Sequence, residues 1–446
     1  MSIEELESPL INVNSLRKMW DGRQRSARAI KSVAKIDASY RKASQRIKKK
    51  EFTKDETRAY YKRVHGNNAD RLYQLCNQNG GTWVKFGQFL SARPDLMPRE
   101  FIKALEPLQN DTQPTLFSDL TMTLEEELGE NWEALFSSID EEPIATASIG
   151  QVHRATLVDG REVAVKIQLP EIKKLFAQDV ILFRTLCSLF GRNVPQIDVT
   201  SMVEYLLKTI EEELDFTNEA NNIVEFTKLD HIQGIKVPVL VKELSTAMVI
   251  TTEWIEGSRL VDYLSQSDRE KQKKVLFLLQ NSYVQQVMRH GVYQGDPHPG
   301  NFLVDDEGNL YILDYGYMGK LTSTETNNFL RLMMVITRNS NENILKVLEE
   351  SGFEGLSKEM FQGDALDLMN SMSGINRKKK MKIAHMDEIM KDLMEQFREY
   401  QITVPDYFLS IGRVFITVGG LLRTYKVPFN VMGGDVSPIK KADPES

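Results

Sequence analysis

The sequence predicts an α+β chain of two lobes, in which a small strand-rich lobe precedes a larger helical lobe. One observation is a hairpin pattern at residues 151–169, where QVHRATL and REVAVKIQL flank a turn containing Asp-Gly. A second is the stretch beyond Gly257, where helical periodicity is interrupted by one further hairpin, NFLV, DDEGN, LYILDYG. The composition, 41% hydrophobic and 27% charged over 446 residues, is typical of a folded chain with two or three domains.

Helices are expected on both sides of the first hairpin. Residues 1–66 are polar and basic with weak helical periodicity, whereas residues 70–135 repeat apolar positions at three- and four-residue spacings, as helices do. After the hairpin, helices are predicted at about residues 170–191 and 200–229. Two strand-like runs, IKVPVLV and TAMVITTEWI, then lead to Gly257. A strand-rich lobe with inserted helices therefore precedes the helical lobe.

Charge is unevenly distributed along the chain. The net charge of -7 argues against a general nucleic-acid binder. Between Arg17 and Arg63, however, 17 Lys and Arg residues face only 5 Asp and Glu residues. This basic arm is either a solvated helix surface or a contact surface for anionic lipid or an acidic partner.

The two cysteines and the apolar segments bear on the cellular compartment. Cys76 and Cys187 match no metal-ligand spacing and no disulfide framework, which suits a reducing compartment. No apolar segment of a secretion signal follows the amino terminus. The apolar stretch at residues 409–422 contains Arg413 and is shorter than the roughly 18 to 20 apolar residues that a span needs. We expect a cytoplasmic protein without a transmembrane helix.

The second hairpin brings polar side chains together. Asn301 opens its first strand and Asp314 closes the second, so antiparallel pairing returns both to one end of the hairpin. Their oxygens are ligands that Mg²⁺ accepts. Asp296 precedes Asn301 by five residues, as the catalytic Asp precedes the metal-binding Asn in protein kinases. Asp314, Tyr315 and Gly316 then occupy the place of the kinase DFG.

The first hairpin carries a candidate phosphate clamp. In VAVKIQ the alternation of a strand places Lys166 on the face opposite to Val163, Val165 and Ile167. The preceding ATASIGQV has the spacing of a kinase phosphate loop with two of three glycines replaced by alanine. The loop residues predicted to contact nucleotide are Ile144, Ala145, Thr146, Ala147, Ser148, Ile149, Gly150, Gln151 and Val152.

Carboxylates that could fix the Lys166 ammonium occur in TIEEELDFTNEANN. Glu213 and Asp215 are two residues apart and diverge on a helix, whereas Asp215 and Glu219 share a face. Further along, Glu253 and Trp254 end a strand before a glycine, as expected of a hinge between lobes where backbone groups would meet a purine.

Each of these motifs has an ordinary structural explanation when taken alone. Asp296 before a proline is typical of an Asx turn, and Lys166 of a lysine whose stem lies on apolar surface. The acidic helix could be a solvated face, and the TTEWIEG strand end could be packing. The register of Asp296 with Asn301 and Asp314 favours a nucleotide and metal site instead.

Taken together, these residues resemble the UbiB-like family of atypical kinases, the AarF-domain kinases, from about Gly80 to Gly319. WVKFGQ matches the KxGQ motif and FLSARPDLMP its continuation. ATAS matches the alanine-rich loop, VAVK the strand lysine, and ELDFTNEA the helix with an ExD motif. GDPHPGN and DYG match the catalytic and metal loops. The shared order of these motifs is what makes the resemblance specific.

The resemblance implies roles for individual residues. Lys166 would pair with Glu219, and Lys85 with Glu213 of the ExD motif. Lys85 and Gln88 would lie over the nucleotide, with the ExD residue Asp215 nearby. Asp296 would be the catalytic base or would orient water, and Asn301 and Asp314 would bind Mg²⁺.

The resemblance also implies a protein-kinase-like two-lobed fold with a helical extension carrying the KxGQ motif. The implied domains are a basic arm at 1–66, the KxGQ extension at 67–142, a kinase-like small lobe with inserted helices at 143–256 and a helical lobe at 257–446. Small departures are Thr146 for alanine, Phe86 for leucine and DYG for DFG. We expect no counterpart of the carboxyl-terminal membrane helices that some members have.

The function implied is ATP or ADP binding with Mg²⁺, and phosphoryl transfer or ATP hydrolysis that supports ubiquinone or other isoprenoid-lipid metabolism. Protein phosphorylation is the less favoured variant, because the extension covers the peptide side and no APE-like segment follows DYGYMGK. The implied partners are a prenyl-lipid or quinone precursor, lipid-biosynthetic proteins, and a membrane surface reached through the basic arm. The rival hypothesis is a nucleotide-gated pseudokinase that acts as a scaffold.

Overall fold

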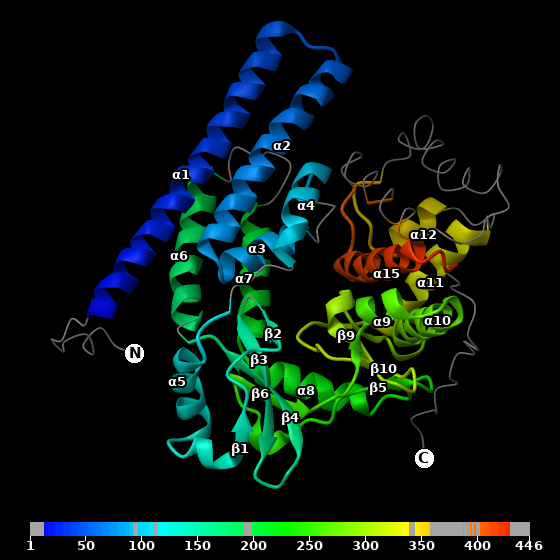
Figure 1. The fold of residues 1–446 in the computed structure, drawn as a ribbon. Coiled ribbons are helices and arrows are strands. Elements are labelled where there is room, and N and C mark those ends of the chain that lie inside the picture. The colour runs from blue at the N-terminus through cyan, green and yellow to red at the C-terminus, as the bar shows by residue number, and fades with distance from the viewer. Residues whose placement is uncertain are drawn as a thin grey trace, which may run out of the picture.

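The computed structural model describes a kinase-like α+β fold of two lobes with a helical extension (Figure 1). The described residues are 13–91, 97–109, 114–147, 149–170, 172–190, 199–338, 344–356 and 402–428, with the single positions 387, 390, 393, 394 and 397. The predicted fold class is confirmed.

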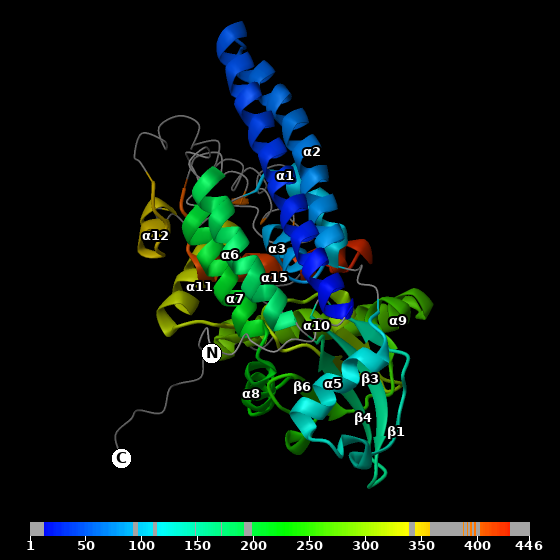
Figure 2. The same cartoon turned by 90° about the vertical axis from the view of Figure 1, so that its left-hand side faces the viewer.

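The helical extension begins with an antiparallel hairpin of two long helices, α1 (Val13–Lys50) and α2 (Lys54–Asn79). Both views show this hairpin projecting beyond the lobes (Figures 1 and 2). The turn is fixed by a capping box, in which the Thr53 side chain accepts from the Glu56 N–H and the Glu56 carboxylate accepts from the Thr53 N–H.

The base of the extension is a compact apolar cluster. It is formed by α2, α3 (Thr82–Ser91), α4 (Arg99–Leu105) and the 3-10 turn η2 (Glu106–Gln109), together with α6 (Ile172–Phe190) and α7 (Val199–Glu213). Trp83 lies at its centre, 4.5 Å between ring centroids from Phe183, and donates to Asp179 at 3.1 Å. The extension is therefore packed onto the helices inserted in the small lobe, which fixes the orientation of α3 over the site.

The small lobe is an antiparallel sheet. Its strands are β1 (Phe136–Ile139), β2 (Ala145–Thr146), β3 (Gly150–Leu157), β4 (Glu162–Gln168) and β6 (Val249–Glu253). The order is β1-β3-β4-β6, with β2 pairing β3. The buried face of β4, with Val163, Val165 and Ile167, packs on α5 (Phe117–Leu128). The 3-10 turns η3 (Trp132–Leu135) and η5 (Lys242–Leu244) complete the lobe.

The helical stretch predicted at 200–229 is two helices rather than one. α7 ends at Glu213 and α8 (Phe216–Thr227) begins after Asp215, whose carboxylate accepts from the Thr217 N–H at 3.0 Å as an N-cap. Glu213 and Asp215 therefore do not lie on one helix, and Glu219 lies in the first turn of α8. The run IKVPVLV forms only a short strand, β5 (Ile235–Lys236), which pairs with β10 (Leu310–Ile312) of the other lobe.

The large lobe is mainly helical and encloses two small sheets. Its helices are α9 (Leu260–Gln266), α10 (Arg269–Gln285), the π-turn η6 (Gln286–His290), the 3-10 turn η7 (Pro299–Asn301), α11 (Ser323–Arg338), α12 (Ile344–Glu350) and α15 (Asp406–Thr424). Its strands are β7 (Ser258–Arg259), β8 (Val292–Gln294), β9 (Phe302–Val304), β10 (Leu310–Ile312) and β11 (Met318–Lys320). The sheet orders are β5-β10-β9-β7 and β11-β8. None of the helices in the described ranges is long and apolar enough to cross a membrane.

Candidate nucleotide and metal site

Lys166 and Glu219 form an ion pair between the sheet and α8. Lys166 leaves β4 on the face opposite to the apolar side chains, and its Nζ lies 2.7 Å from Glu219 Oε2. Phe216 lies beneath the ammonium, with its ring centroid 5.1 Å from Nζ. Both charged side chains are largely buried, so the low local dielectric strengthens their attraction. The strand alternation and the N-cap of α8 together create this pair.

Asp314 belongs to the same charged cluster. Its Oδ2 lies 3.8 Å from Lys166 Nζ, and its Oδ1 accepts from the Gly316 N–H at 2.9 Å. Burial raises the pKa of a carboxyl, but Lys166 and the Gly316 N–H hold the pKa of Asp314 below its ordinary value. For Glu219 burial prevails, and its pKa is raised despite Lys166. Asp314 is thus kept ionised, as a cation ligand must be.

The loop after β8 is held by backbone contacts of Asp296. Its carbonyl accepts from the His298 N–H at 2.7 Å, from Asn301 Nδ2 at 3.0 Å and from Gln294 Nε2 at 2.9 Å. Because the Asn301 amide nitrogen is used in this way, its oxygen is the atom that can meet a cation. The Leu313 N–H donates to the Asn301 carbonyl at 2.9 Å, which brings Asn301 next to Asp314 as the hairpin geometry predicts.

The extension contributes a second ion pair close by. Lys85 of α3 lies 2.5 Å, Nζ to Oε2, from Glu213 at the end of α7. Burial lowers the pKa of a lysine, but Glu213, and then Asp314 and Asp296, raise the pKa of Lys85 above its ordinary value. Lys85 is therefore electrostatically coupled to the two acidic residues of the site. Gln88 of the same helix donates to the Leu108 carbonyl at 3.0 Å.

The loop at 144–152 is a tight turn that enters β3. Ala145 and Thr146 pair with Val152 and Gln151, and the Ala147 N–H donates to the Gly150 carbonyl at 2.8 Å. A Cβ on Gly150 would lie 2.7 Å from the Ile167 carbonyl oxygen, so glycine is required there by close backbone approach to β4.

Some predicted loop contacts have other partners. The Gln151 side chain is buried and binds the backbone N–H and carbonyl of Thr115. Ile149 is buried in the main apolar core, and the Ile144 carbonyl accepts from Arg259 at 2.9 Å. Ser148 lies outside the described residues. These side chains anchor the loop to other parts of the chain. The backbone N–H of Ala147 closes the turn itself.

The strand end before the hinge also has structural partners. Glu253 accepts from the Val239 N–H at 3.1 Å. The Trp254 indole donates to Glu256 at 3.0 Å and lies under the Arg154 guanidinium, 4.5 Å from the ring. The side chains of Glu253 and Trp254 thus have partners within the protein. The predicted contact with a purine base would therefore be made by backbone groups of the hinge.

Sequence reasoning missed the contribution of Arg413. This residue lies on α15, and its Nη2 is 3.4 Å from Asp296 Oδ1. The available signal is a charged residue inside the apolar stretch 409–422, because a charge is unusual on a helix packed into a core. Gln294, which orients the Asp296 backbone from a fully buried position, was also missed.

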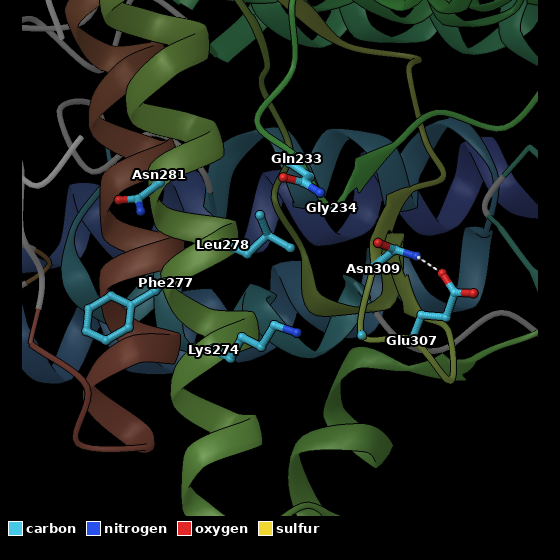
Figure 3. A pocket seen from close by; sticks show the side chains of 9 residues that line it. Gln233, Gly234, Lys274, Phe277, Leu278, Asn281, Glu307 and Asn309 are labelled. Carbon is cyan, nitrogen blue, oxygen red and sulfur yellow. Dashed lines mark hydrogen bonds between the residues drawn. The ribbon is translucent and has the colours of Figure 1, made fainter. Parts of the chain in front are cut away.

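A cavity of about 590 Å³ lies away from this cluster, between α10 and the turn that joins β9 to β10 (Figure 3). Lys274 and Asn281 line it from α10, and Glu307 and Asn309 from the turn. The Asn309 side chain is held by Glu307 at 3.1 Å. None of its lining residues belongs to the cluster around Lys166 and Asp314.

Lys166 on a strand pairs with Glu219 on a helix and lies near Asp314 at the end of a two-stranded hairpin. Together with the two-lobed architecture, this arrangement defines a protein-kinase-like fold. Within that class the chain belongs to the family described as the ABC1 atypical kinase-like domain, whose model matches residues 107–348. The predicted resemblance to the UbiB-like, AarF-domain kinases is confirmed.

Two of three similar proteins carry names of this family. AarF domain-containing protein kinase 1 of Xenopus tropicalis is 32% identical, over 68% of this chain and 60% of that protein. The Arabidopsis thaliana protein named activity of bc1 complex kinase 8, chloroplastic, is 30% identical over 70% of this chain and 42% of its own length. An uncharacterised protein of Synechocystis is 31% identical over 84% and 66%. The chain therefore spans 42 to 66% of the length of these relatives.

A solved structure has the same fold. The complex of Rv3197 with erythromycin, from Mycobacterium tuberculosis, superposes with a TM-score of 0.56 at 26% identity. The match covers 86% of this chain and 99% of that one.

Proposed function

We propose that this protein binds ATP with Mg²⁺ and either hydrolyses it or transfers its terminal phosphoryl group. The observation that carries the proposal is the charged cluster of Lys166, Glu219 and Asp314, with Asn301 adjoining it. Lys166, held by Glu219, is placed to neutralise phosphate oxygens. Phosphoryl transfer depends mainly on positioning and charge neutralisation, which this arrangement supplies.

The donor set at the end of the β9–β10 hairpin fits Mg²⁺. Asp314 offers an ionised carboxylate and Asn301 an amide oxygen, both hard ligands. Among the described residues no group of three or more His, Cys, Asp or Glu side chains could hold a metal ion. A cation at Asn301 and Asp314 would therefore complete its shell with phosphate oxygens and water, as Mg²⁺ does in nucleotide sites. When bound, it would neutralise the phosphate charge.

Asp296 is the residue we assign to the acceptor. Its side chain adjoins the loop that ends at Asn301, and it is about half exposed, so an entering hydroxyl or water can reach it. As a base or a water-orienting group it acts on one proton of the acceptor, which needs a heavy-atom separation of about 2.6 to 3.2 Å.

The test is ATP turnover by the purified chain with and without Mg²⁺, in the wild type and in Asp314→Asn. We expect the variant to lose Mg²⁺-dependent turnover. Asp305→Asn is the matched control, because Asp305 belongs to the turn at the other end of the same hairpin, where it accepts from the Asn309 N–H at 2.8 Å. Wild-type turnover by Asp314→Asn would contradict the assignment.

For the acceptor we propose a prenyl-lipid or quinone precursor, or water, in a cytoplasmic protein that works at a membrane surface with lipid-biosynthetic partners. Two features support a small acceptor: the family membership, and α3, which brings Lys85 into the electrostatic neighbourhood of Asp296. Turnover measured with a water-soluble prenyl alcohol and with an unrelated serine peptide distinguishes the classes. Stimulation by the peptide alone would contradict the lipid role.

The tip of the α1–α2 hairpin supports membrane contact. Tyr60 lies between two guanidinium groups, 5.6 Å from Arg46 and 5.4 Å from Arg63, and Phe52 packs against its edge. Lys48, Lys49 and Lys50 end α1 beside them. Basic and aromatic side chains together suit an anionic lipid interface, where each basic residue contributes roughly 1 kcal/mol.

The tip is tested by replacing Lys48, Lys49 and Lys50 with Gln and sedimenting the protein with vesicles of anionic lipid. We expect weaker binding, whereas the same change at Lys271, Lys273 and Lys274 of α10 should have little effect. Equal sedimentation of the two triple variants would remove the membrane role of the tip.

A nucleotide-gated scaffold is the second candidate, favoured by Lys85, because Asp314 and Asp296 contribute to the raised pKa of this lysine. In that case the protein would bind ATP with Mg²⁺ and change its partner contacts without turnover. Nucleotide binding by thermal shift, combined with no phosphate release in the presence of lipid vesicles, would support the scaffold over the enzyme.

A further inference from the structure

Arg413 connects the last described helix to the loop that carries Asp296. Its neighbours on α15, including Ile411, Val414 and Phe415, are buried in the core of the large lobe. The Arg413 side chain instead reaches the end of β8, where Nε and Nη2 both donate to the Gly295 carbonyl, at 3.1 and 2.8 Å. A charged donor therefore holds the residue directly before Asp296.

The same guanidinium also contacts the Asp296 side chain. Nη2 lies 3.4 Å from Oδ1, which is within ion-pair distance, and both groups are partly exposed. Asp296 is thus fixed on two sides, since Gln294 holds its backbone N–H at 3.1 Å and its carbonyl at 2.9 Å. Gln294 orients the backbone and Arg413 orients the carboxylate.

Tyr317 holds Arg413 in place. The guanidinium lies over the Tyr317 ring, 5.2 Å from its centroid, and the Tyr317 hydroxyl meets Ser410 of α15 at 3.1 Å. The ring also packs directly on Gly295, because a Cβ there would lie 2.2 Å from a ring carbon. Gly295 therefore has to be glycine for Tyr317 and Arg413 to approach the loop.

We propose that Arg413 is a positioning residue for Asp296. It fixes the Gly295 carbonyl and holds Oδ1 of Asp296, so that Oδ2 is the oxygen presented to the acceptor. The inference rests on the proposed ATP-dependent reaction and deepens it, because it makes α15 a support for the residue assigned to the acceptor.

The chemistry requires a guanidinium rather than any cation. A planar fork can donate two hydrogen bonds to one carbonyl and still contact a neighbouring carboxylate, whereas a lysine ammonium is a point charge on a flexible stem. Lysine at position 413 should therefore replace the charge but not the orientation. If the role of Arg413 were purely structural, its replacement would change the free energy of unfolding and not kcat specifically.

The experiment compares ATP hydrolysis by the full chain in the wild type, Arg413→Ala and Arg413→Lys. Misplacing a reacting group by about 1 Å costs on the order of 100-fold in rate, so we expect kcat of Arg413→Ala to fall by about that factor with KM for ATP little changed. Millimolar guanidinium chloride should restore part of the turnover of Arg413→Ala, and urea at the same concentration should not. Arg413→Lys should remain impaired.

Arg331→Ala is the matched control. Arg331 has a similar exposure to Arg413, 33% against 30%, and pairs at 2.7 Å with Glu350, away from the site. It should keep wild-type turnover and show no response to guanidinium. If Arg413→Ala does not fold, Arg413→Gln keeps the side-chain stem and takes its place in the rescue measurement.

The outcomes separate the inference from the function on which it rests. Wild-type turnover together with an unimpaired Arg413→Ala, or an impaired one that guanidinium does not restore, would overturn the positioning role alone. Absence of Mg²⁺-dependent turnover in the wild-type protein would instead overturn the proposed function.

Discussion

Lys85 of α3 and Glu213 of α7 form an ion pair of 2.5 Å that joins the helical extension to the small lobe. Both side chains are mostly covered, with 23% and 20% of their surfaces exposed. Lys166 and Glu219 form a second pair nearby, on the adjoining β4 and α8. The position of the extension over the site therefore depends on a specific charge pair as well as on apolar packing around Trp83.

The first prediction concerns the strength of this pair. A double-mutant cycle with Lys85→Met and Glu213→Gln should give a coupling energy of about 1 to 3 kcal/mol in the free energy of unfolding. The more exposed pair Arg184 and Glu204, with 58% and 45% exposure at 2.7 Å, should couple by less than about 1 kcal/mol. Urea unfolding of the two cycles checks this, and equal coupling energies would argue against a specific tether.

The second prediction contrasts two helical glycines. Gly87 of the KxGQ motif has no room for a Cβ, which would lie 2.3 Å from Leu108 Cδ1 and 3.3 Å from Cys76 Sγ. Gly87→Ala should destabilise the protein by roughly 1 to 3 kcal/mol through overpacking. Gly66 of α2 has no atom within 4 Å of such a Cβ, so Gly66→Ala should stabilise by about 0.5 to 1 kcal/mol through helix propensity.

Thermal unfolding of the two glycine variants measures the contrast directly. The second variant serves as the control for the first, since both place alanine in a helix. A gain in stability at Gly87 would show that α3 can move away from Leu108 of η2 without cost, and would remove packing as the reason for this glycine.

Local features of the site were predictable from sequence because they follow from short-range geometry. The period of two in a strand places Lys166, and the antiparallel hairpin places Asn301 beside Asp314. The break between Glu213 and Asp215 was missed, although Asp215 is a favoured N-cap residue and the break gives α8 its own axis. Helical periodicity continues across such a break when the next helix is also amphipathic.

The contact of Arg413 with Asp296 is one that the local sequence pattern could not predict. Arg413 lies more than a hundred residues beyond Asp296, and the contact exists because α15 packs beside β11 and α10. Gln151 illustrates the converse, because a polar residue in a predicted phosphate loop is used to hold Thr115. Which face of a short loop is buried depends on the segment that packs against it, and that segment is distant in sequence.

The third prediction concerns the two alanines of the loop before β3. The Ala147 N–H closes a turn onto the Gly150 carbonyl, and alanine restricts its backbone more than glycine would. Ala147→Gly should change the ratio of ATP to ADP affinity without unfolding the protein, because the loop N–H groups would gain freedom to meet the phosphates. Titration with both nucleotides checks this, and unchanged affinities would show that the alanines have no tuning role.

The last prediction is a loss of stability in mild acid that depends on His153. This residue is fully buried, its Nδ1 donates to the Asp140 carbonyl at 2.8 Å, and the Gln151 amide lies 3.4 Å from Nε2. The Phe117 ring covers it from α5. Burial lowers the pKa of His153 below its ordinary value, even though the Asp140 carbonyl favours the charged form. The neutral ring suits this site because Nε2 faces an amide donor.

The direction in which stability changes with pH follows from proton uptake by the unfolded chain. As the pH falls through about 6.5, the unfolded chain takes up a proton that the folded chain resists, so stability present above that pH is progressively lost. The slope contributed by one such group approaches about 1.4 kcal/mol per pH unit at most. Urea unfolding at pH 7.5 and pH 5.5 should show a larger loss for the wild type than for His153→Gln, which carries no titrating group at this position. Equal losses in the two proteins would mean that another group, such as the half-buried His231, governs the acid response.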